Sequence, residues 1–572
     1  MSEGATKSSV SVHWFRRCLR VHDNVALIEA TKHSDYVIPL YVLDTTDTRT
    51  SVRKQEFLLD SLRDLDKTLR ERYETQLFFA RGDPRVIVPN FVKRWKAQKV
   101  TFEKVSEPHL LKQDTMIITK LDQLGVEVKT FTLHTLFDLG KLGDLCNKNP
   151  PLIFKDFSKL LDEAGPVERY LVAPSSIPPA PEGIREMMDD APSTSMWKGD
   201  VPTLTCLGVK PPPSSNSFQG GESAALLRLE KILCSEEPVK SDTTTNPFDP
   251  SSTVLSPYLN LGCLSVRKFY HDVTDMLEAT EQGKKPFVSI EGQLLWREFY
   301  YLVGAYTPNF DKMKGNKICK QIPWRTRELD PAFDEDLLAW AEGQTGYPFI
   351  DAIMVQLKTT GWIHHLARHA VACFLSRGDL WISWEEGAKV FERLLLDGDW
   401  SLNTGNWLWL SASCFFYQYY RVYSPVRFGN MTDKTGNYVR RWIPALKDMP
   451  DEYIYEPWKA PIDVQRKANC IVGKDYPERI IDHEEAKERN VARMRMAYKS
   501  NEAREELDNS VGSGVSGLSS SDARDTVADS TDSLQDGSSI YSSDCESNII
   551  DQTKMDVRTT SPRTGGEKRK RT

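Results

Sequence analysis

The sequence has no long apolar run, no paired cysteines and no excess of basic residues. No stretch of 18 apolar residues occurs among the 572, so nothing is expected to span a membrane. The opening segment MSEGATKSSV lacks the charged and apolar regions of a secretory signal. The ten cysteines include no CxxC pair, which argues against a zinc site or a disulfide framework and favours a reducing compartment.

The charge balance gives no support for DNA binding. The formal net charge is −7, and residues 501–572 carry 9 basic and 14 acidic groups, which leaves −2 for the first 500 residues. A protein that lives on duplex DNA usually shows a basic excess, because phosphate contacts supply most of its affinity. Any DNA contact would therefore depend on local patches of charge.

Length and residue patterns divide the chain into several parts, since 572 residues are too many for one core. Residues 8–140 alternate β-type and helical patterns, which predicts an α/β domain with a doubly wound parallel sheet. Residues 141–216 are rich in proline, so we expect a surface connector without regular elements. Residues 217–500 show 3.6-residue apolar spacing, which predicts a large all-helical domain.

The expected elements can be placed along both domains. The expected strands are 11–15, 36–43, 76–80, 100–103 and 126–131, with helices at 24–31 and 54–70. The expected helices of the second domain include 225–233, 332–341, 350–357, 362–375 and 384–396.

The composition changes again over residues 501–572. Its Ser, Asp and Gly tracts cannot bury enough surface to offset the entropy of ordering, so we expect a disordered tail. The chain ends in Lys-Arg-Lys-Arg at 568–571, which is typical of nuclear import signals and equally of a solvated basic end. Nucleus and cytoplasm are the expected locations.

Tryptophan is concentrated in the predicted helical domain, where nine of the fourteen lie between residues 296 and 409. Core filling is the more frequent role for any single one. The cluster as a whole favours another use, because indole is readily oxidised and neighbouring rings can pass a hole in single steps. Such a chain of rings needs a buried chromophore.

Residues 394–410, LLLDGDWSLNTGNWLWL, place Asp397, Asp399, Asn403 and Asn406 between apolar helices. Buried charge without a partner is costly, so these groups need partners. One interpretation is helix capping beside solvated turns. The other is a polar wall around a bound heterocycle.

The segment GWIHHLARHAV carries His365 and His369 on one helix face, because their spacing is i, i+4. No Glu follows in the HExxH manner, so we expect no metal. Arg368 is well placed to pair with an Asp. Upstream, residues 252–257, Ser-Thr-Val-Leu-Ser-Pro, offer hydroxyl and N–H groups just before a helix, where a diphosphate could bind.

The sequence resembles the animal cryptochrome/(6-4) photolyase family over residues 10–500. The resemblance is carried by HWFRRCLRVHDN, TVLSPYLNLGCLSVRKFY, GQLLWREFYY, QTGYPFIDAIMVQL, GWIHHLARHAVACFLSRGDLWISWEEG, the 394–410 segment, RVYSPV and YEPWKAP. It implies an α/β domain followed by a helical domain that holds FAD in a U-shaped conformation. An antenna pigment is left open, because DTTDTRTSVRKQEFLL at 44–59 lacks the aromatic/Arg run typical of that loop.

The resemblance also implies roles for single residues. Thr253, Leu255 and Ser256 would contact the FAD phosphates, and Asn403 would face the flavin N5. Arg368 would pair with Asp397. The full implied FAD set is Thr253, Leu255, Ser256, Gln293, Arg297, His365, Arg368, Asp397, Asp399 and Asn403. The implied electron-transfer residues, from the flavin outward, are Trp407, Trp384, Trp324 and Trp381.

Two uses of such a site compete. A (6-4) photolyase repairs a flipped DNA lesion with light, His365 and His369 handling protons. The residues that match its lesion pocket are Gln293, Trp296, Tyr300, Trp409 and Arg421. A light receptor instead signals to clock or other partner proteins, through its tail or an oligomeric contact. A third alternative is a light-independent transcriptional repressor of the clock.

The sequence favours the receptor over a repair enzyme. Asn260 stands where family members commonly have Lys or Arg, which we interpret as the loss of a phosphate contact. The first 500 residues have no basic excess, and the acidic, Ser-rich tail suits a signalling output. Asn403 stands where insect-type light receptors commonly have a cysteine, and this difference counts against the receptor interpretation.

Overall fold

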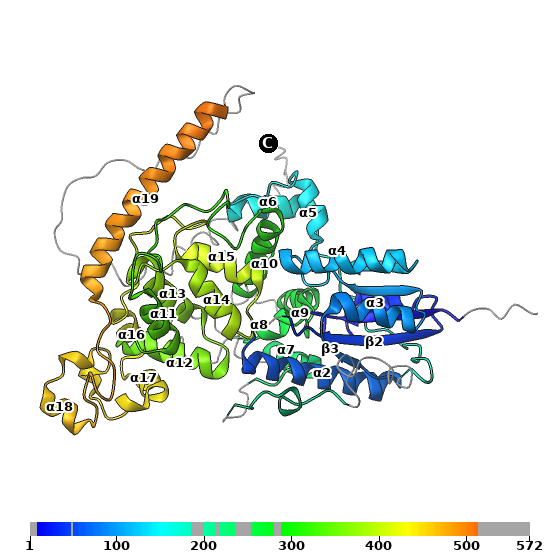
Figure 1. Cartoon of the computed structure of the whole chain (residues 1–572), viewed down its shortest axis with the longest axis horizontal. Helices are drawn as coiled ribbons and strands as arrows, with labels where there is room; N and C mark the ends of the chain where they lie inside the picture. Colours follow the sequence, from blue (N-terminus) through cyan, green and yellow to red (C-terminus); the bar gives the residue numbers. More distant parts are fainter. Residues whose placement is uncertain are drawn as a thin grey trace, which may run out of the picture. The chain divides into compact units, whose positions relative to one another are not determined.

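The computed structural model describes most of the chain, coloured along its sequence in Figure 1. The described residues are 8–46, 50–184, 200–212, 218–234, 253–279 and 288–512. Ser252, residues 47–49 of the 44–59 loop and residues 513–572 of the predicted disordered tail lie outside them. Residues up to Lys499 form one compact unit. Within the described residues, no helix combines the length and apolar character needed to cross a membrane.

The N-terminal part is built on a five-stranded parallel sheet, as predicted. Its strands are β1 Val10–Phe15, β2 Tyr36–Leu43, β3 Phe78–Arg81, β4 Lys99–Glu103 and β5 Glu127–Phe131. The strand order is β3-β2-β1-β4-β5, and every neighbouring pair is parallel. The direction of strand order therefore reverses between β1 and β4, which is where α/β sheets of this kind open a crevice at their carboxyl ends.

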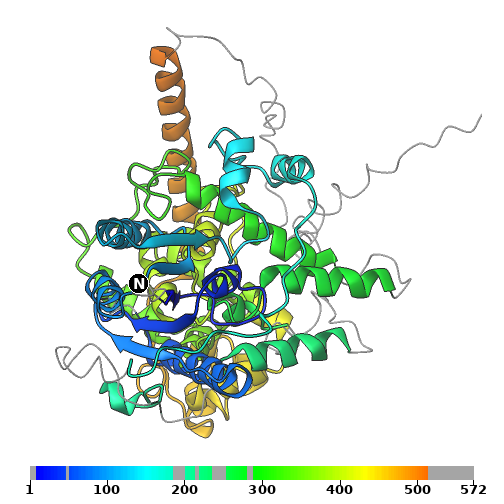
Figure 2. The same cartoon turned by 90° about the vertical axis from the view of Figure 1, so that its right-hand side faces the viewer.

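Helices cover both faces of this sheet (Figure 2). The helices are α1 Val25–Thr31, α2 Val52–Tyr73, α3 Pro84–Arg94 and α4 Pro108–Gln123. Trp14 of β1 packs with Ile87 of α3 and Ile117 of α4 in one core cluster. Phe15, the next residue, packs with Phe57 of α2 in another. This alternation follows from the two-residue period of a strand and confirms the doubly wound prediction.

The prediction of a connector without regular elements was wrong in part. Helix α5, Leu139–Leu145, spans the predicted start of the connector at residue 141. Helix α6, Phe154–Ala164, and a short 3-10 turn, η2 Thr205–Leu207, lie within the connector. Phe157 of α6 is fully buried against Phe299, with ring centroids 5.5 Å apart. The prolines at 150 and 151 stand between the two helices rather than inside them, so they end elements instead of preventing them.

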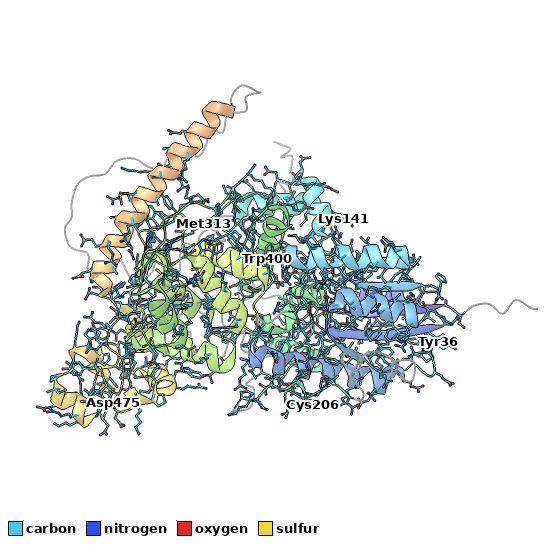
Figure 3. All side chains as sticks on the ribbon, in the orientation of Figure 1. Tyr36, Lys141, Cys206, Met313, Trp400 and Asp475 are labelled. Atoms are coloured by element: carbon cyan, nitrogen blue, oxygen red, sulfur yellow. The ribbon has the colours of Figure 1, made fainter. Side chains whose placement is uncertain are left out.

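Helices joined by loops make up the rest of the described chain, and side chains fill the space between the helices (Figure 3). The helices are α7 Glu222–Leu233, α8 Ser256–Asn260, α9 Val266–Ala279, α10 Val288–Tyr306, α11 Phe333–Glu342, α12 Pro348–Thr360, α13 His365–Cys373, α14 Trp384–Leu394, α15 Trp400–Leu410, α16 Arg427–Thr432, α17 Asn437–Trp442, α18 Ile462–Lys467 and α19 His483–Gly512. A π-helical segment, Phe374–Gly378, follows α13. Because α19 runs to Gly512, regular structure continues past the predicted start of the tail at residue 501.

The α/β and helical parts meet directly at Gly262. This glycine has φ +63°, and a Cβ built on it would lie 1.9 Å from the carbonyl oxygen of Arg17. Only glycine fits such a close approach in the left-handed region. Beside it, Arg20 donates from Nη1 to the Gly262 carbonyl at 2.8 Å, and the Leu19 amide donates to Leu261 at 3.2 Å. The end of β1 is thereby fixed against α8.

Candidate cofactor site

The centre of the site is an ion pair between α13 and the turn that joins α14 to α15. Arg368 Nη2 lies 2.8 Å from Asp397 Oδ2, which confirms the predicted pairing. The hydroxyl of Ser256, at the start of α8, donates to the same oxygen at 2.6 Å. The other carboxylate oxygen, Oδ1, is buried and has no hydrogen-bond partner among the described residues. It is therefore free to accept a bond from a bound group.

Asp399 serves both as a helix cap and as part of a polar wall, the two interpretations considered for residues 394–410. It caps α15, because its Oδ1 accepts from the Leu402 amide at 3.0 Å. Its Oδ2 accepts a short hydrogen bond from the hydroxyl of Tyr301 on α10, and the residue is 2% exposed. Asn403, one turn on, donates from Nδ2 to the Ala388 carbonyl of α14 at 2.9 Å. These bonds fix α10, α14 and α15 around one polar wall.

The other predicted FAD residues differ in exposure. Leu255 is buried, Thr253 is half-buried with its carbonyl accepting from Arg228, and Gln293 is exposed. Val254, between Thr253 and Leu255, has φ +44°, which is a strained value for a β-branched residue. Arg297 is buried, with its guanidinium 4.6 Å from the centre of the Tyr301 ring.

Glu298 lies beside Arg297, with Oε1 3.3 Å from Nη1, and is fully buried. Burial raises the pKa of Glu298 to about 7, although Arg297 and two backbone N–H groups act in the opposite direction. Its carboxyl group therefore titrates near neutral pH. No motif in the sequence points to Glu298.

The predicted histidine pair shares one face of α13, with ring centroids of His365 and His369 5.9 Å apart. Burial lowers the pKa of His365 well below its usual range, with His364, His369 and Arg368 lowering it further. Burial also lowers the pKa of His369 to about 4, so both rings are neutral at pH 7. The His365 side chain keeps solvent-accessible surface, and His369 is half-buried.

All four predicted relay tryptophans are buried. Trp324 and Trp381 are in contact, with ring centroids 4.8 Å apart at an interplanar angle of 54°. Trp407 packs against α14 at Gly387, one turn from Trp384, since a Cβ on Gly387 would lie 2.2 Å from its ring. Among the described residues no ring contact joins Trp384 to Trp407 or to Trp324, so those two steps stay predictions.

Trp407 instead has an unpredicted indole neighbour. The ring of Trp340, on α11, lies 6.3 Å from that of Trp407, and Phe391 lies 5.1 Å from it. Trp340 is fully buried and donates from Nε1 to the Val371 carbonyl at 3.0 Å. Trp407 Nε1 has no partner among the described residues.

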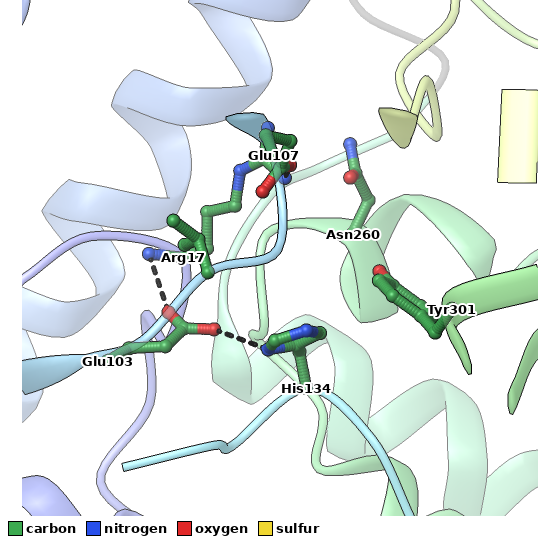
Figure 4. Close-up of a pocket in the computed structure, with 7 residues that line it drawn as sticks. Arg17, Glu103, Glu107, His134, Asn260 and Tyr301 are labelled. Atoms are coloured by element: carbon green, nitrogen blue, oxygen red, sulfur yellow. Dashed lines mark hydrogen bonds and ion pairs between the residues drawn. The ribbon is translucent and has the colours of Figure 1, made fainter. Parts of the chain in front are cut away.

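A small pocket lies where the strand order reverses, at the carboxyl ends of β1 and β4 (Figure 4). The Arg17 guanidinium donates to Glu107, and its amide donates to Glu103 at 3.0 Å. Glu103 Oε1 lies 3.4 Å from His134 Nδ1. The His134 ring is 4.9 Å from Tyr301, whose hydroxyl reaches Asp399. A line of polar groups thus joins the sheet to the cofactor wall.

The side chain of Asn260 lines this small pocket, which corrects its predicted role (Figure 4). Its Nδ2 donates to the Leu396 carbonyl at 2.9 Å, and its Oδ1 is buried without a partner among the described residues. A side chain that faces an internal pocket is not positioned to contact DNA phosphates. Its identity therefore carries no argument against repair.

Comparisons with known proteins match both parts of the chain. Residues 11–179 match the family model DNA photolyase, and residues 289–496 match the FAD binding domain of DNA photolyase. A Cryptochrome-1 of Erithacus rubecula is 44% identical over 496 residues, covering 85% of this chain and 78% of that protein. The chain belongs to the cryptochrome–photolyase family.

Photolyases of the cryptochrome–photolyase family are similar to this chain as well. A (6-4)DNA photolyase of Arabidopsis thaliana is 44% identical over 511 residues, covering 86% of this chain and 89% of that protein. The solved class III photolyase of Agrobacterium tumefaciens superposes with a TM-score of 0.73 at 27% identity, over 87% of this chain and all of that one. The identities thus do not separate the two functional classes.

The chain carries an FAD-binding domain, as predicted, and its residues fit that cofactor. The unpaired Asp397 oxygen can accept a hydrogen bond, and the Arg368 cation stands beside it. The exposed hydroxyl of Ser256 and the half-buried amide of Asn403 add groups that bind heterocycles and phosphates.

In this cryptochrome–photolyase family member, three of the residues assigned to a lesion pocket form one aromatic cluster. Trp296 lies 6.0 Å from Tyr300 and 5.5 Å from Trp409, measured between ring centroids. Phe154 of α6 stacks on Trp296 at 4.2 Å with an interplanar angle of 17°. That face of Trp296 is already covered. Gln293 is exposed and Arg421 half-buried, and among the described residues no side-chain hydrogen bond or cation–π contact joins either to this cluster.

Proposed function

We propose that this protein is a blue-light receptor of the cryptochrome kind. The observation that carries the proposal is the buried contact at 4.8 Å between Trp324 and Trp381, two of the four tryptophans assigned to the relay. A repair enzyme and a receptor both need an electron donor, but Phe154 on Trp296 occupies an aromatic face that a flipped base would use.

The chain's residues divide the work. Arg368, Asp397, Asp399 and Asn403 would hold FAD, which supplies blue-light absorption and accepts an electron when bound. Trp407 gives up the first electron, and the hole then moves through Trp384 to Trp324 and Trp381. Each transfer leaves the donor oxidised and restores the previous ring, so only the far end carries the positive charge. Distance from the cofactor slows recombination.

The same site responds to the charge that light separates. His365 and His369 are neutral at pH 7, because burial lowers the pKa of both, and a neutral ring can accept a proton when negative charge appears nearby. The response would pass to signalling or clock proteins in the nucleus and cytoplasm, through the tail or a homo-oligomeric contact. Light-dependent control of timing is the expected output.

The second candidate function is (6-4) repair. It is favoured by the histidine pair, by the Trp296–Tyr300–Trp409 cluster and by the equal similarity to a (6-4)DNA photolyase. One assay separates the two. Purified protein loaded with FAD is illuminated with blue light in the presence of DNA that contains a (6-4) lesion. The receptor proposal predicts photoreduction without lesion loss, and conversion of the lesion would contradict it.

A further inference from the structure

Trp381, the last ring of the proposed relay, is held rigidly in a strained turn. Its φ is +57°, and it follows the π-helical segment Phe374–Gly378. A bulky residue in the left-handed region is a genuine outlier of the kind that clusters at functional sites. Its amide donates to Ser376 at 3.0 Å, and its Nε1 donates to the Pro323 carbonyl at 2.8 Å. The orientation of the indole is therefore fixed.

The beginning of α19 is anchored to the same turn. His483 Nδ1 lies 2.7 Å from Asp379 Oδ1, and both residues are buried. Asn490, two turns on, donates from Nδ2 to the carbonyls of Gly378 at 3.1 Å and Asp379 at 2.9 Å. One turn further, the guanidinium carbon of Arg493 stands over the Trp381 ring, 5.5 Å from its centre.

The positive charge of Arg493 is not neutralised. In the part of the chain that the structure describes, no carboxylate lies within 4.0 Å of its guanidinium, and Nη1 donates a long hydrogen bond to Asn490 Oδ1 at 3.5 Å. Burial lowers its pKa, and repulsion from Arg489 and Arg325 adds to that effect. Arg325, in contrast, is paired with Asp330 and Asp336 at 2.9 and 2.8 Å.

We propose that Arg493 couples helix α19 to the oxidation state of Trp381. The inference rests on the proposed relay. A neutral indole attracts a cation over its face. An oxidised indole carries a positive charge itself, so the same contact becomes repulsive. By linkage, the hole loosens Arg493 from the ring, and Arg493 disfavours the hole on Trp381 to the same extent.

The electron and proton balance is simple. Trp381 gives one electron to oxidised Trp324, which returns to its neutral form, and no bond forms or breaks. The Nε1 proton of Trp381 stays in place, because its partner is the Pro323 carbonyl, which is not a base at neutral pH. The ring is 3% exposed, so water has little access to that proton. The positive charge therefore remains opposite Arg493.

The test compares the lifetime of oxidised tryptophan after a blue flash in FAD-loaded full-length variants. Arg493→Gln should lengthen it about tenfold or more, because a unit charge near the hole is removed. Arg493→Lys keeps the charge and should stay near wild type. Arg495→Gln removes a charge from an exposed position of the same helix and should also have no effect. Equal lifetimes in wild type and Arg493→Gln, or equal lengthening in Arg493→Lys, would overturn the proposal.

Hydrogen exchange of the α19 amides in the dark gives a second readout. In Arg493→Gln it should match wild type, because His483 and Asn490 still hold the helix. Faster exchange of the α19 amides in Arg493→Gln in the dark would show that Arg493 only holds the helix in place, and it would also overturn the coupling. The relay itself fails separately, if wild type forms no oxidised tryptophan or if Trp381→Phe leaves the lifetime unchanged.

Discussion

Arg368 and Asp397 form an ion pair across the cofactor site at 2.8 Å, and only one oxygen of the carboxylate is used. The pair joins α13 to the turn before α15, and the Asp397 side chain is 7% exposed. A partly buried cation that faces a half-satisfied carboxylate is a costly arrangement without a ligand to complete it. We therefore expect the pair to take part in cofactor binding.

Asp397→Asn should weaken FAD binding about tenfold or more, because it removes the charge that holds Arg368 and a strong acceptor. A fluorescence titration of the apoprotein with FAD measures the change. Arg393→Leu, at an exposed position of the neighbouring α14, is the matched control and should bind like wild type. Wild-type affinity in Asp397→Asn would remove this pair from the site.

Tyr301→Phe should lower the free energy of unfolding by about 1–3 kcal/mol, because a buried carboxylate oxygen of Asp399 loses its donor. Urea denaturation of the apoprotein measures the loss without the cofactor. Tyr420→Phe removes the hydroxyl of an exposed tyrosine and should leave stability unchanged. If both variants unfold at the same urea concentration, the Tyr301–Asp399 bond contributes nothing to the wall.

Glu298 should make stability depend on pH. Its pKa is raised from 4.5 to about 7 in the folded chain, so the folded state holds a proton that the unfolded state has released. Stability then falls as the pH rises from about 4.5 through about 7 and is lowest above that range. Glu298→Gln should cancel this loss, gaining about 3 kcal/mol relative to wild type between pH 5 and pH 8.

The measurement is urea denaturation of wild type and Glu298→Gln across that pH range. Glu335→Gln, at an exposed position, serves as the control for the loss of a negative charge. A pH-independent difference between Glu298→Gln and wild type would show that the buried carboxyl group is ionised throughout.

Gly262→Ala should destabilise the protein by more than about 2 kcal/mol, because the new methyl group meets the Arg17 carbonyl at 1.9 Å in a left-handed backbone. Gly292→Ala is the opposite control. It lies in α10 with nothing within 4 Å, so alanine should stabilise it by about 0.5–1 kcal/mol. Thermal unfolding compares the two, and equal melting temperatures would contradict the tight contact at Gly262.

The sequence predicts local structure here better than long-range contacts. The strands followed from their apolar patterns, and the Arg368–Asp397 pair followed from the motif resemblance. The order of the strands rests on pairing between distant segments, so the pocket of Arg17, Glu103 and His134 had no local signal. Helices α5 and α6 were missed because nearby prolines outweighed the apolar spacing of α6.

The contact of Arg493 with Trp381 had no local signal either. The two residues lie on segments far apart in the chain, and an arginine in a polar helix normally faces solvent. The contact between Trp340 and Trp407 could not be predicted from the sequence either, because tryptophan serves both core filling and electron transfer. Composition identified the cluster of indoles, but only the packing shows which rings touch.

The proposed tryptophan relay is tested most directly by the rate of flavin photoreduction in blue light, measured for FAD-loaded Trp407→Phe and Trp340→Phe. Each substitution replaces a buried tryptophan with phenylalanine, and the two tryptophan rings lie 6.3 Å apart. We expect Trp407→Phe to lose rapid photoreduction and Trp340→Phe to keep the wild-type rate. Unchanged kinetics in Trp407→Phe would contradict the proposed relay.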